Sequence, residues 1–406
     1  MTSTDPRPEL TAPEVQVCPF PYYATLRDED PVHRLPGSEV YLLTRHADVH
    51  AALRRPQVFS SLRPSLAAAD PEIAAIEAQG WPTVPTLTNN DPPSHTTYRK
   101  LIKTWFTSSA VARREPGIRA VIDDLIDAFA GRGSVEFVDE FADRLPSYVV
   151  GDFIGQPRDM APTFKRWARD ITQAVNPSAT REEALEYRRS FVDFQHYFAG
   201  EIERVRADPG QDFLSFLVTA EVDGEQLSVE ALLDLLRVFI NGGNETVASL
   251  LTNTMYYLLL DPEQLAAVLA DHSLIPNAVE ETIRLDTPGQ WLPRTATDDV
   301  EVAGTLIPKG ARVLMMLGSA NRDAAVFPDP ERFDIRRSTA GHLAYGFGIH
   351  FCAGAPIARL EARVAFEALL DRLPNIRVAV PLHELEFVAQ PILRQLERLP
   401  LEFDAR

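Results

Sequence analysis

The chain has 406 residues, 45% of them hydrophobic and 24% charged, which is typical of folded globular proteins and excludes a disordered chain. Its 40 basic and 58 acidic residues give a net charge of −18, which disfavours binding to the phosphate backbone of nucleic acids. No apolar run approaches about 18 residues, Met1–Leu10 is polar, and the two cysteines lie far apart, so we expect a cytoplasmic protein without a membrane span or disulfide framework.

Apolar residues recur at intervals of three and four along much of the chain, which predicts a mainly helical fold. The predicted helices cover 120–130, 162–175, 181–206, 227–260, 262–270, 276–285 and 356–373. Short strand-like runs lie at 40–44, 300–307, 311–316, 376–380 and 398–403. No linker, repeat or low-complexity tract divides the chain, so we predict one mainly α domain with a minor β region over 1–406.

A histidine and an arginine lie close together in the segment 91–99. His95 and Arg99 are four residues apart at the start of a helix, so their side chains point the same way and can bind one anionic group. Considered singly, such residues are more often plain surface residues.

The predicted helix 227–260 is apolar on most sides but contains Asn241-Gly242-Gly243-Asn244-Glu245-Thr246 near its middle. A glycine inside a helix costs about 1 kcal/mol relative to alanine, so the two glycines require a reason. One explanation is a kink in which Thr246 hydrogen-bonds to the preceding turn.

Glu281 and Arg284 lie three residues apart on the predicted helix 276–285, so their side chains share one face. Surface pairing is the usual explanation for this spacing. The apolar residues around the pair indicate that parts of this helix are buried instead.

The segment Tyr345–Gly354 (YGFGIHFCAG) ends where the predicted helix 356–373 begins. Cys352 therefore lies at the amino end of a helix, where unpaired N–H groups and the helix dipole lower cysteine pKa values from about 8.5 to roughly 3.5–7.5. Gly346, Gly348 and Gly354 permit close backbone approach to a flat ligand. An isolated Cys-x-Gly before a helix would more often be an ordinary buried cysteine.

This segment resembles the haem-binding signature of the cytochrome P450 family, Phe-Gly-x-Gly-x-His-x-Cys-x-Gly, at every specified position except the first, where Tyr345 replaces phenylalanine. The family's other motifs follow in order, so the resemblance covers nearly the whole chain. It implies the cytochrome P450 fold, with haem b (iron protoporphyrin IX) sandwiched between a long central helix and the cysteine loop. Cys352 would be the axial metal ligand, and the hydroxyl of Tyr345 would lie near the sulfur.

The resemblance also implies roles for the other motifs. Glu245 and Thr246 correspond to the acid and alcohol that deliver protons for cleavage of dioxygen, in a groove opened by the glycines, and Val247 follows where many relatives have a second threonine. Glu281, Arg284 and Arg332 correspond to a buried structural triad behind the cysteine loop. Further haem contacts are implied for His95, Arg99, Arg294, His350, Phe347, Gly348 and Gly354.

A mainly apolar substrate pocket is also implied, in which Gln290 and Asn241 can orient one polar group. Its expected lining residues are Leu87, Phe239, Asn241, Gly242, Gln290, Trp291, Leu292, Ile392 and Leu393.

The chain has too few cysteines for an iron–sulfur cluster and no flavin-binding segment, so electrons must come from a ferredoxin or flavodoxin. Basic residues near the thiolate side can dock an acidic partner, although scattered surface charges are an equally good explanation. They are Arg99, Lys100, Lys103, Arg113, Arg114, Arg359 and Arg363.

We therefore expect a monomeric monooxygenase that inserts one oxygen atom from O2 into a hydrophobic small molecule, using NAD(P)H through ferredoxin reductase and ferredoxin. One alternative is a peroxygenase driven by hydrogen peroxide, but relatives of that kind usually replace the pair Glu245 and Thr246. The other is a non-catalytic haem or recruitment protein, and the intact Cys352 argues against it.

Overall fold

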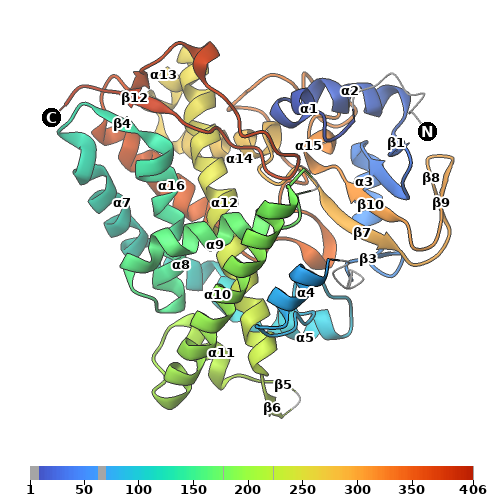
Figure 1. Cartoon of the computed structure of the whole chain (residues 1–406). Coiled ribbons are helices and arrows are strands. Elements are labelled where there is room, and N and C mark those ends of the chain that lie inside the picture. The colour runs from blue at the N-terminus through green and yellow to red at the C-terminus, as the bar shows by residue number, and fades with distance from the viewer. Residues whose placement is uncertain (1–8, 63–69, 177, 223, 406) are drawn as a thin grey trace.

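The computed structural model describes residues 9–62, 70–176, 178–222 and 224–405 (Figure 1). Its helices are α1 (Pro13–Val17), α2 (Phe20–Glu29), α3 (His46–Leu53), α4 (Pro71–Glu77), α5 (Ser94–Ile102), α6 (Ser108–Ala112), α7 (Glu115–Ala130), α8 (Arg144–Ile154), α9 (Ala161–Gln173), α10 (Arg181–Ala207), α11 (Phe213–Thr219), α12 (Val229–Leu260), α13 (Pro262–Ala270), α14 (Ile275–Leu285), α15 (Leu317–Ala320) and α16 (Ala355–Arg372). The strands are β1 (Val32–Arg34), β2 (Val40–Leu43), β3 (Phe59–Ser60), β4 (Ser134–Glu136), β5 (Glu221–Val222), β6 (Glu225–Gln226), β7 (Leu292–Ala296), β8 (Val300–Val302), β9 (Thr305–Ile307), β10 (Arg312–Met315), β11 (Arg377–Val378) and β12 (Pro400–Glu402).

The predicted mainly helical fold with a minor β region is confirmed. Every helix predicted from apolar spacing is present with its ends shifted by a few residues, and the predicted strand 300–307 is the hairpin β8–β9. The missed helices are mostly short, and α8 was hidden because a proline and a glycine, Pro146 and Gly151, interrupt its apolar pattern. None of the described helices is both long and apolar enough to span a membrane.

The central helix α12 has 32 residues and divides the apolar core into two large clusters. Residues of its first half, among them Leu232 and Ile240, pack with α9, α10 and α11. Residues of its second half, among them Leu251 and Met255, pack with α7, α14 and α16. Ser228 caps the helix by accepting a hydrogen bond from the Ala231 N–H. In Figure 1, α12 runs through the middle of the molecule with α8, α9 and α10 beside it.

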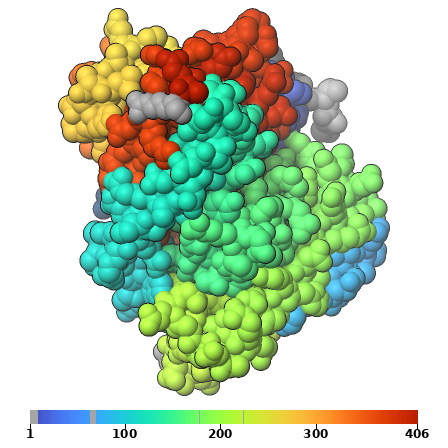
Figure 2. All heavy atoms as spheres, turned by 90° about the vertical axis from the view of Figure 1, so that its left-hand side faces the viewer, coloured from blue at the N-terminus to red at the C-terminus, as the bar shows by residue number. Residues whose placement is uncertain are grey.

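A five-stranded sheet, in the order β1-β2-β10-β7-β3, lies beside the helices and carries two segments of the site. Strand β7 contains Arg294, and β3 pairs antiparallel with it so that Ser60 lies opposite Thr295. At the other end of the chain, β12 pairs with β4 and β11. On the face in Figure 2, this C-terminal segment (red) therefore lies beside α7 (teal), where Phe403 packs against Phe129.

Candidate active site

Cys352 lies in the loop between a short 3₁₀ turn, Gly348–His350, and α16. Its own N–H donates to the Tyr345 carbonyl at 2.9 Å. Gly348 has a φ of 71°, and a Cβ there would lie 2.8 Å from the carbonyl oxygen of Leu53. The loop therefore requires glycine at this position for both backbone conformation and close packing.

The electrostatics of the thiol differ from the expectation. Burial raises the pKa of Cys352, and this outweighs the hydrogen bonds from the N–H groups of Gly354 and Ala355 and the nearby charges of Arg99 and Arg359, which lower it. The helix-end N–H groups therefore act on the pKa of this thiol in the predicted direction, but they do not bring it below its usual value. A coordinated metal ion would deprotonate the thiol in any case.

Four of the predicted haem contacts converge beside the loop. His95 and Arg99 come from α5, Arg294 comes from β7, and His350 comes from the cysteine loop. The rings of His95 and His350 have centroids 4.3 Å apart, and the Arg99 Nη2 donates to the Phe351 carbonyl at 2.6 Å.

His95 and Arg294 are buried and Arg99 and His350 are half-buried, with little compensating negative charge. Burial lowers the pKa of Arg294 to about 10, and the pKa of His350 to about 3 with further lowering by the charges of Arg294 and His95. In the described part of the chain, no carboxylate pairs with Arg294 and the Nδ1 of His95 has no hydrogen-bond partner. Because buried cations and donors are normally paired, the cluster fits the two carboxylates of a haem.

Two contacts of this cluster were missed by the sequence analysis. The Ser61 hydroxyl lies 2.8 Å from Nε2 of His350, and the Ser61 N–H donates to Asp91 at 2.9 Å. Ser60 also donates to Asp91. The β3–β7 pairing brings these serines to the site, and no spacing within the sequence indicates that pairing.

The other two predicted haem contacts in the loop are Phe347 and Gly354. Phe347 is 38% exposed, and its ring centroid lies 4.3 Å from that of His50. A Cβ at Gly354 would make an ordinary contact with the Cys352 sulfur at 3.9 Å. Both residues adjoin the sulfur-bearing turn, as their positions in the motif require.

The two glycines of α12 serve different purposes. A Cβ at Gly243 would lie 2.7 Å from Val150 of α8, so glycine is needed there for helix packing. A Cβ at Gly242 would meet nothing within 4 Å, and the Thr246 hydroxyl donates to the Gly242 carbonyl at 2.7 Å. Thr246 therefore makes the expected bond to the preceding turn, beside an open space along an otherwise continuous helix.

Glu245 is buried and forms an ion pair that the sequence analysis did not find. Its Oε1 lies 2.7 Å from Nζ of Lys165 on α9, and the same nitrogen lies 2.7 Å from Oδ1 of Asp143. Burial raises the pKa of Glu245, and the ammonium group of Lys165 opposes this shift. The carboxyl group can consequently hold a proton at a higher pH than an exposed glutamate does.

Asn241 is tied to α9. Its Nδ2 donates to the Ala168 carbonyl at 3.0 Å and to the Thr172 hydroxyl at 2.7 Å. The expectation that this amide orients a substrate is corrected for its nitrogen, because both of its N–H groups are used in holding α9 against α12.

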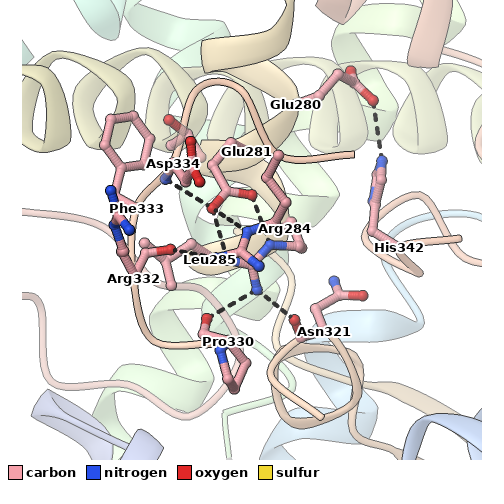
Figure 3. A network of polar contacts seen from close by, with 12 residues as sticks. Glu280, Glu281, Arg284, Leu285, Asn321, Pro330, Arg332, Phe333, Asp334 and His342 are labelled. Atoms are coloured by element: carbon pink, nitrogen blue, oxygen red, sulfur yellow. Dashed lines mark hydrogen bonds and ion pairs between the residues drawn. The ribbon is translucent and has the colours of Figure 1, made fainter. Parts of the chain in front are cut away.

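Glu281 and Arg284 form the expected ion pair, and both side chains are fully buried. The Arg284 Nε lies 2.7 Å from Oε2 of Glu281, and its Nη1 donates to the carbonyls of Asn321 and Pro330 (Figure 3). This geometry joins α14 to the loop that precedes the cysteine segment.

The third member of this cluster was predicted wrongly. Arg332 is exposed, whereas the Nε of Arg337 lies 3.1 Å from Oε1 of Glu281. The loop after Pro330 turns so that the Arg337 side chain returns to Glu281 and donates to the Arg332 carbonyl. Motif position alone cannot tell which of two nearby arginines a loop turns inward.

A family profile described as cytochrome P450 matches residues 147–375. The chain is 37% identical over 392 residues to the cytochrome P450 monooxygenase PikC of Streptomyces venezuelae, covering 95% of this chain and 91% of that relative. The chain belongs to the cytochrome P450 family. Vitamin D(3) 25-hydroxylase of Pseudonocardia autotrophica is a further relative, 36% identical over 392 residues that cover 96% of this chain and 94% of that protein.

The fold of this cytochrome P450 agrees with solved structures. CYP109E1 from Bacillus megaterium, in complex with testosterone, matches with a TM-score of 0.86 and 31% sequence identity, over 97% of this chain and 100% of that chain. The relatives are named monooxygenases and hydroxylases, so this chain is an enzyme of the cytochrome P450 monooxygenase family, which binds haem iron.

Three residues predicted to line the substrate pocket of this cytochrome P450 pack against other parts of the protein instead: Gln290 and Trp291 are buried, and Phe239 is half-buried. Phe239 stacks on Phe106 with centroids 5.6 Å apart. The Gln290 amide packs against Gly318, and the Trp291 Nε1 donates to a carbonyl within a buried cluster. These predictions are corrected, because packing against elements distant in sequence sets the direction of each side chain.

The remaining predicted pocket residues are apolar and buried or half-buried. Leu292 lies at the start of β7, 3.5 Å from where a Cβ of Gly346 would be, and so contacts the cysteine loop. Leu87 and Leu393 are buried, and Ile392 is half-buried. The burial of these four residues is compatible with the predicted substrate contacts.

Proposed function

We propose that this cytochrome P450 inserts one oxygen atom of O2 into a hydrophobic small molecule, by hydroxylation or epoxidation. For hydroxylation, the substrate, O2, two electrons and two protons give the alcohol and one water. The observation that carries the proposal is the presence, in one chain, of Cys352, of four haem-carboxylate donors that form no ion pair with a described carboxylate, and of the pair Glu245 and Thr246.

The cofactor of this proposal is haem b within a single catalytic domain over 1–406. Cys352 would bind the metal as a thiolate, and His95, Arg99, Arg294 and His350 would bind the carboxylates. When bound, the haem supplies the redox chemistry that activates dioxygen. The protein contributes the buried donors, the exclusion of water and the proton-carrying side chains.

Thr246 is proposed to hold a proton-donating hydroxyl beside the open space at Gly242, and Glu245 to supply the proton. The raised pKa of Glu245 supports this role, because a general acid must keep its proton near the working pH. Lys165 would be a positioning residue that holds the Glu245 carboxyl in place.

Thr246→Ala is expected to retain substrate binding while electrons are diverted to hydrogen peroxide or to water. The hydroxyl would be lost without a change in the apolar pocket, and Thr246→Ser should preserve coupling. The ratio of product formed to NAD(P)H consumed measures the effect. Full coupling in Thr246→Ala, or turnover with peroxide that equals turnover with ferredoxin, would favour the peroxygenase alternative instead.

Lys165→Met is expected to raise the pKa of Glu245 further, because the charge that opposes burial is removed. The carboxyl group then stays protonated to higher pH, so the pH profile of product coupling should move upward. Lys165→Arg keeps the charge and should leave the profile near that of the unmodified enzyme. An identical profile for Lys165→Met would separate Lys165 from the proton supply.

The relatives suggest where a substrate search should begin. One is named a vitamin D(3) hydroxylase, and one solved structure contains testosterone. Both ligands are large, mostly apolar molecules, which agrees with the apolar character of Leu87, Leu292 and Leu393. We propose that the substrate belongs to this size and polarity class, and a low-to-high spin shift on addition of steroid-like compounds tests it.

Electrons are proposed to arrive from NAD(P)H through an external acidic ferredoxin or flavodoxin. Arg359 is paired with Glu280, and Arg363 with Glu115 and Glu367, so these arginines are less available than the sequence suggested. Lys100, Lys103 and Arg113 are exposed and form no ion pair with another described residue. These three side chains therefore carry the proposed docking charge.

Lys103→Glu is expected to slow reduction by an acidic ferredoxin by about tenfold at low ionic strength, with a smaller effect at high salt. Lys309→Glu makes the same charge change in the β9–β10 turn and serves as the control. Stopped-flow reduction measures both. Equal effects of the two variants would assign the slowing to net charge alone.

A further inference from the structure

The C-terminal turn, residues 386–397, is bonded to the segment that leads into β7. The Gln290 N–H donates to the Ile392 carbonyl at 2.8 Å, and the Arg394 N–H donates to the Pro288 carbonyl at 2.9 Å. Because β7 begins at Leu292, which contacts the cysteine loop, the position of this turn is linked to the site. The turn also carries two of the proposed pocket residues, Ile392 and Leu393.

Arg394 is the charged residue at the base of the C-terminal turn, and it is only 6% exposed. Its Nε lies 3.3 Å from Oδ1 of Asp286, which is fully buried at the end of α14. Its guanidinium carbon lies 3.4 Å from the ring centroid of Phe387 and 5.1 Å from that of Phe20. Arg394 thus contacts the end of α14, its own turn and the N-terminal segment.

The N-terminal segment makes a second contact with the same side chain. The Nη1 of Arg394 donates to the Val17 carbonyl, at the end of α1. On the other side, Asp286 accepts a hydrogen bond from Tyr257 of α12 at 3.2 Å. One guanidinium group therefore connects α1 and α2 to the C-terminal turn, and through Asp286 to the central helix.

A buried ion pair is a poor source of stability, since apolar side chains of similar volume often stabilise a fold as well or better. Its directional bonds do, however, fix the relative positions of the elements that it joins. A planar guanidinium group that stacks on two rings while it binds a carboxylate and a carbonyl has one acceptable orientation. The turn that carries it is held to that orientation.

We propose that Arg394 is a positioning residue through which the N-terminal segment sets the location of Ile392 and Leu393 in the substrate pocket. The proposal rests on the proposed function, since it assumes that the turn faces substrate. It implies that Val17 and Phe20 influence substrate selection without touching the substrate. Small movements of α1 and α2 would change the shape of the pocket through this one side chain.

The test uses the haem-loaded full chain and two probes, imidazole and 4-phenylimidazole, whose binding shifts the Soret band. The two share the nitrogen that binds iron. The Kd of imidazole divided by the Kd of 4-phenylimidazole therefore reports contacts of the phenyl group with the pocket. Arg394→Lys keeps the charge but loses the planar fork, and we expect it to reduce the ratio at least fivefold with imidazole binding unchanged. Arg398→Ala removes an exposed arginine from the same region and should change neither constant.

Hydrogen exchange supplies a readout that is independent of haem. Arg394→Lys should increase amide exchange both in residues 386–397 and in the N-terminal residues 13–29, whereas a purely local role would affect the turn alone. Phe20→Leu removes one of the two rings that contact the Arg394 guanidinium group. It should increase amide exchange in the same two segments, but by less than Arg394→Lys does. This variant keeps the test decisive if Arg394 variants fail to fold.

An unchanged ratio and unchanged exchange in Arg394→Lys or Phe20→Leu would overturn the positioning role. A protein that lacks thiolate-bound haem would instead contradict the proposed function, while its exchange pattern would still report on the contact between the turn and the N-terminal segment. The two failures are therefore distinguishable.

Discussion

Replacing Cys352 with alanine is expected to abolish the red-shifted Soret band of the reduced, carbon monoxide-treated protein. The sulfur is the proposed axial ligand, and the chain's other cysteine, Cys18, lies outside the cysteine loop, at the end of α1. Cys18→Ala is the matched control and should leave the band in place. An unchanged spectrum in Cys352→Ala, or binding of the metal through nitrogen, would contradict thiolate ligation.

Glu281→Ala is expected to destabilise the fold by about 3–5 kcal/mol, since it leaves the buried Arg284 and the nearly buried Arg337 without their carboxylate. Haem content should fall with stability, because this cluster joins α14 to the loop before the cysteine segment. Denaturant unfolding and the haem-to-protein ratio measure the two effects.

Two arginine variants make this prediction specific. Arg337→Ala should be clearly destabilising, because it removes a partner of Glu281. Arg332→Ala should change stability by less than about 0.5 kcal/mol, since its side chain is exposed. Equal losses in the two variants would contradict the assignment of this role to Arg337 alone, and a loss in Arg332→Ala only would transfer the role to Arg332.

The fold was predictable because long helices carry their own periodic signal. The apolar spacing of α12, α10 and α16 gave their extents to within a few residues. Local motifs likewise led to Cys352 and to the donors around it, because each motif packs many chemically specific positions into one short segment. Fold and cysteine loop are therefore properties that the sequence displays locally.

Contacts between distant segments could not be predicted in the same way. Lys165 reaches Glu245 from another helix, and Ser61 reaches His350 across a strand pairing. Nothing in the spacing around either residue indicates its partner. The direction of a side chain is equally non-local: Phe239 lies one turn before Gly243 on α12, yet its ring packs among other aromatic side chains.

Because different halves of α12 pack into different apolar clusters, the enzyme has two large packing units that both contact this one helix. The side with α14 and α16, where Cys352 is proposed to bind the metal, can keep its packing while the side with α9, α10 and α11 is changed. Substitutions made in different packing units should add in their effects on folding free energy, as distant sites usually do. Laboratory evolution of new specificities would accordingly find its tolerant positions on the second side.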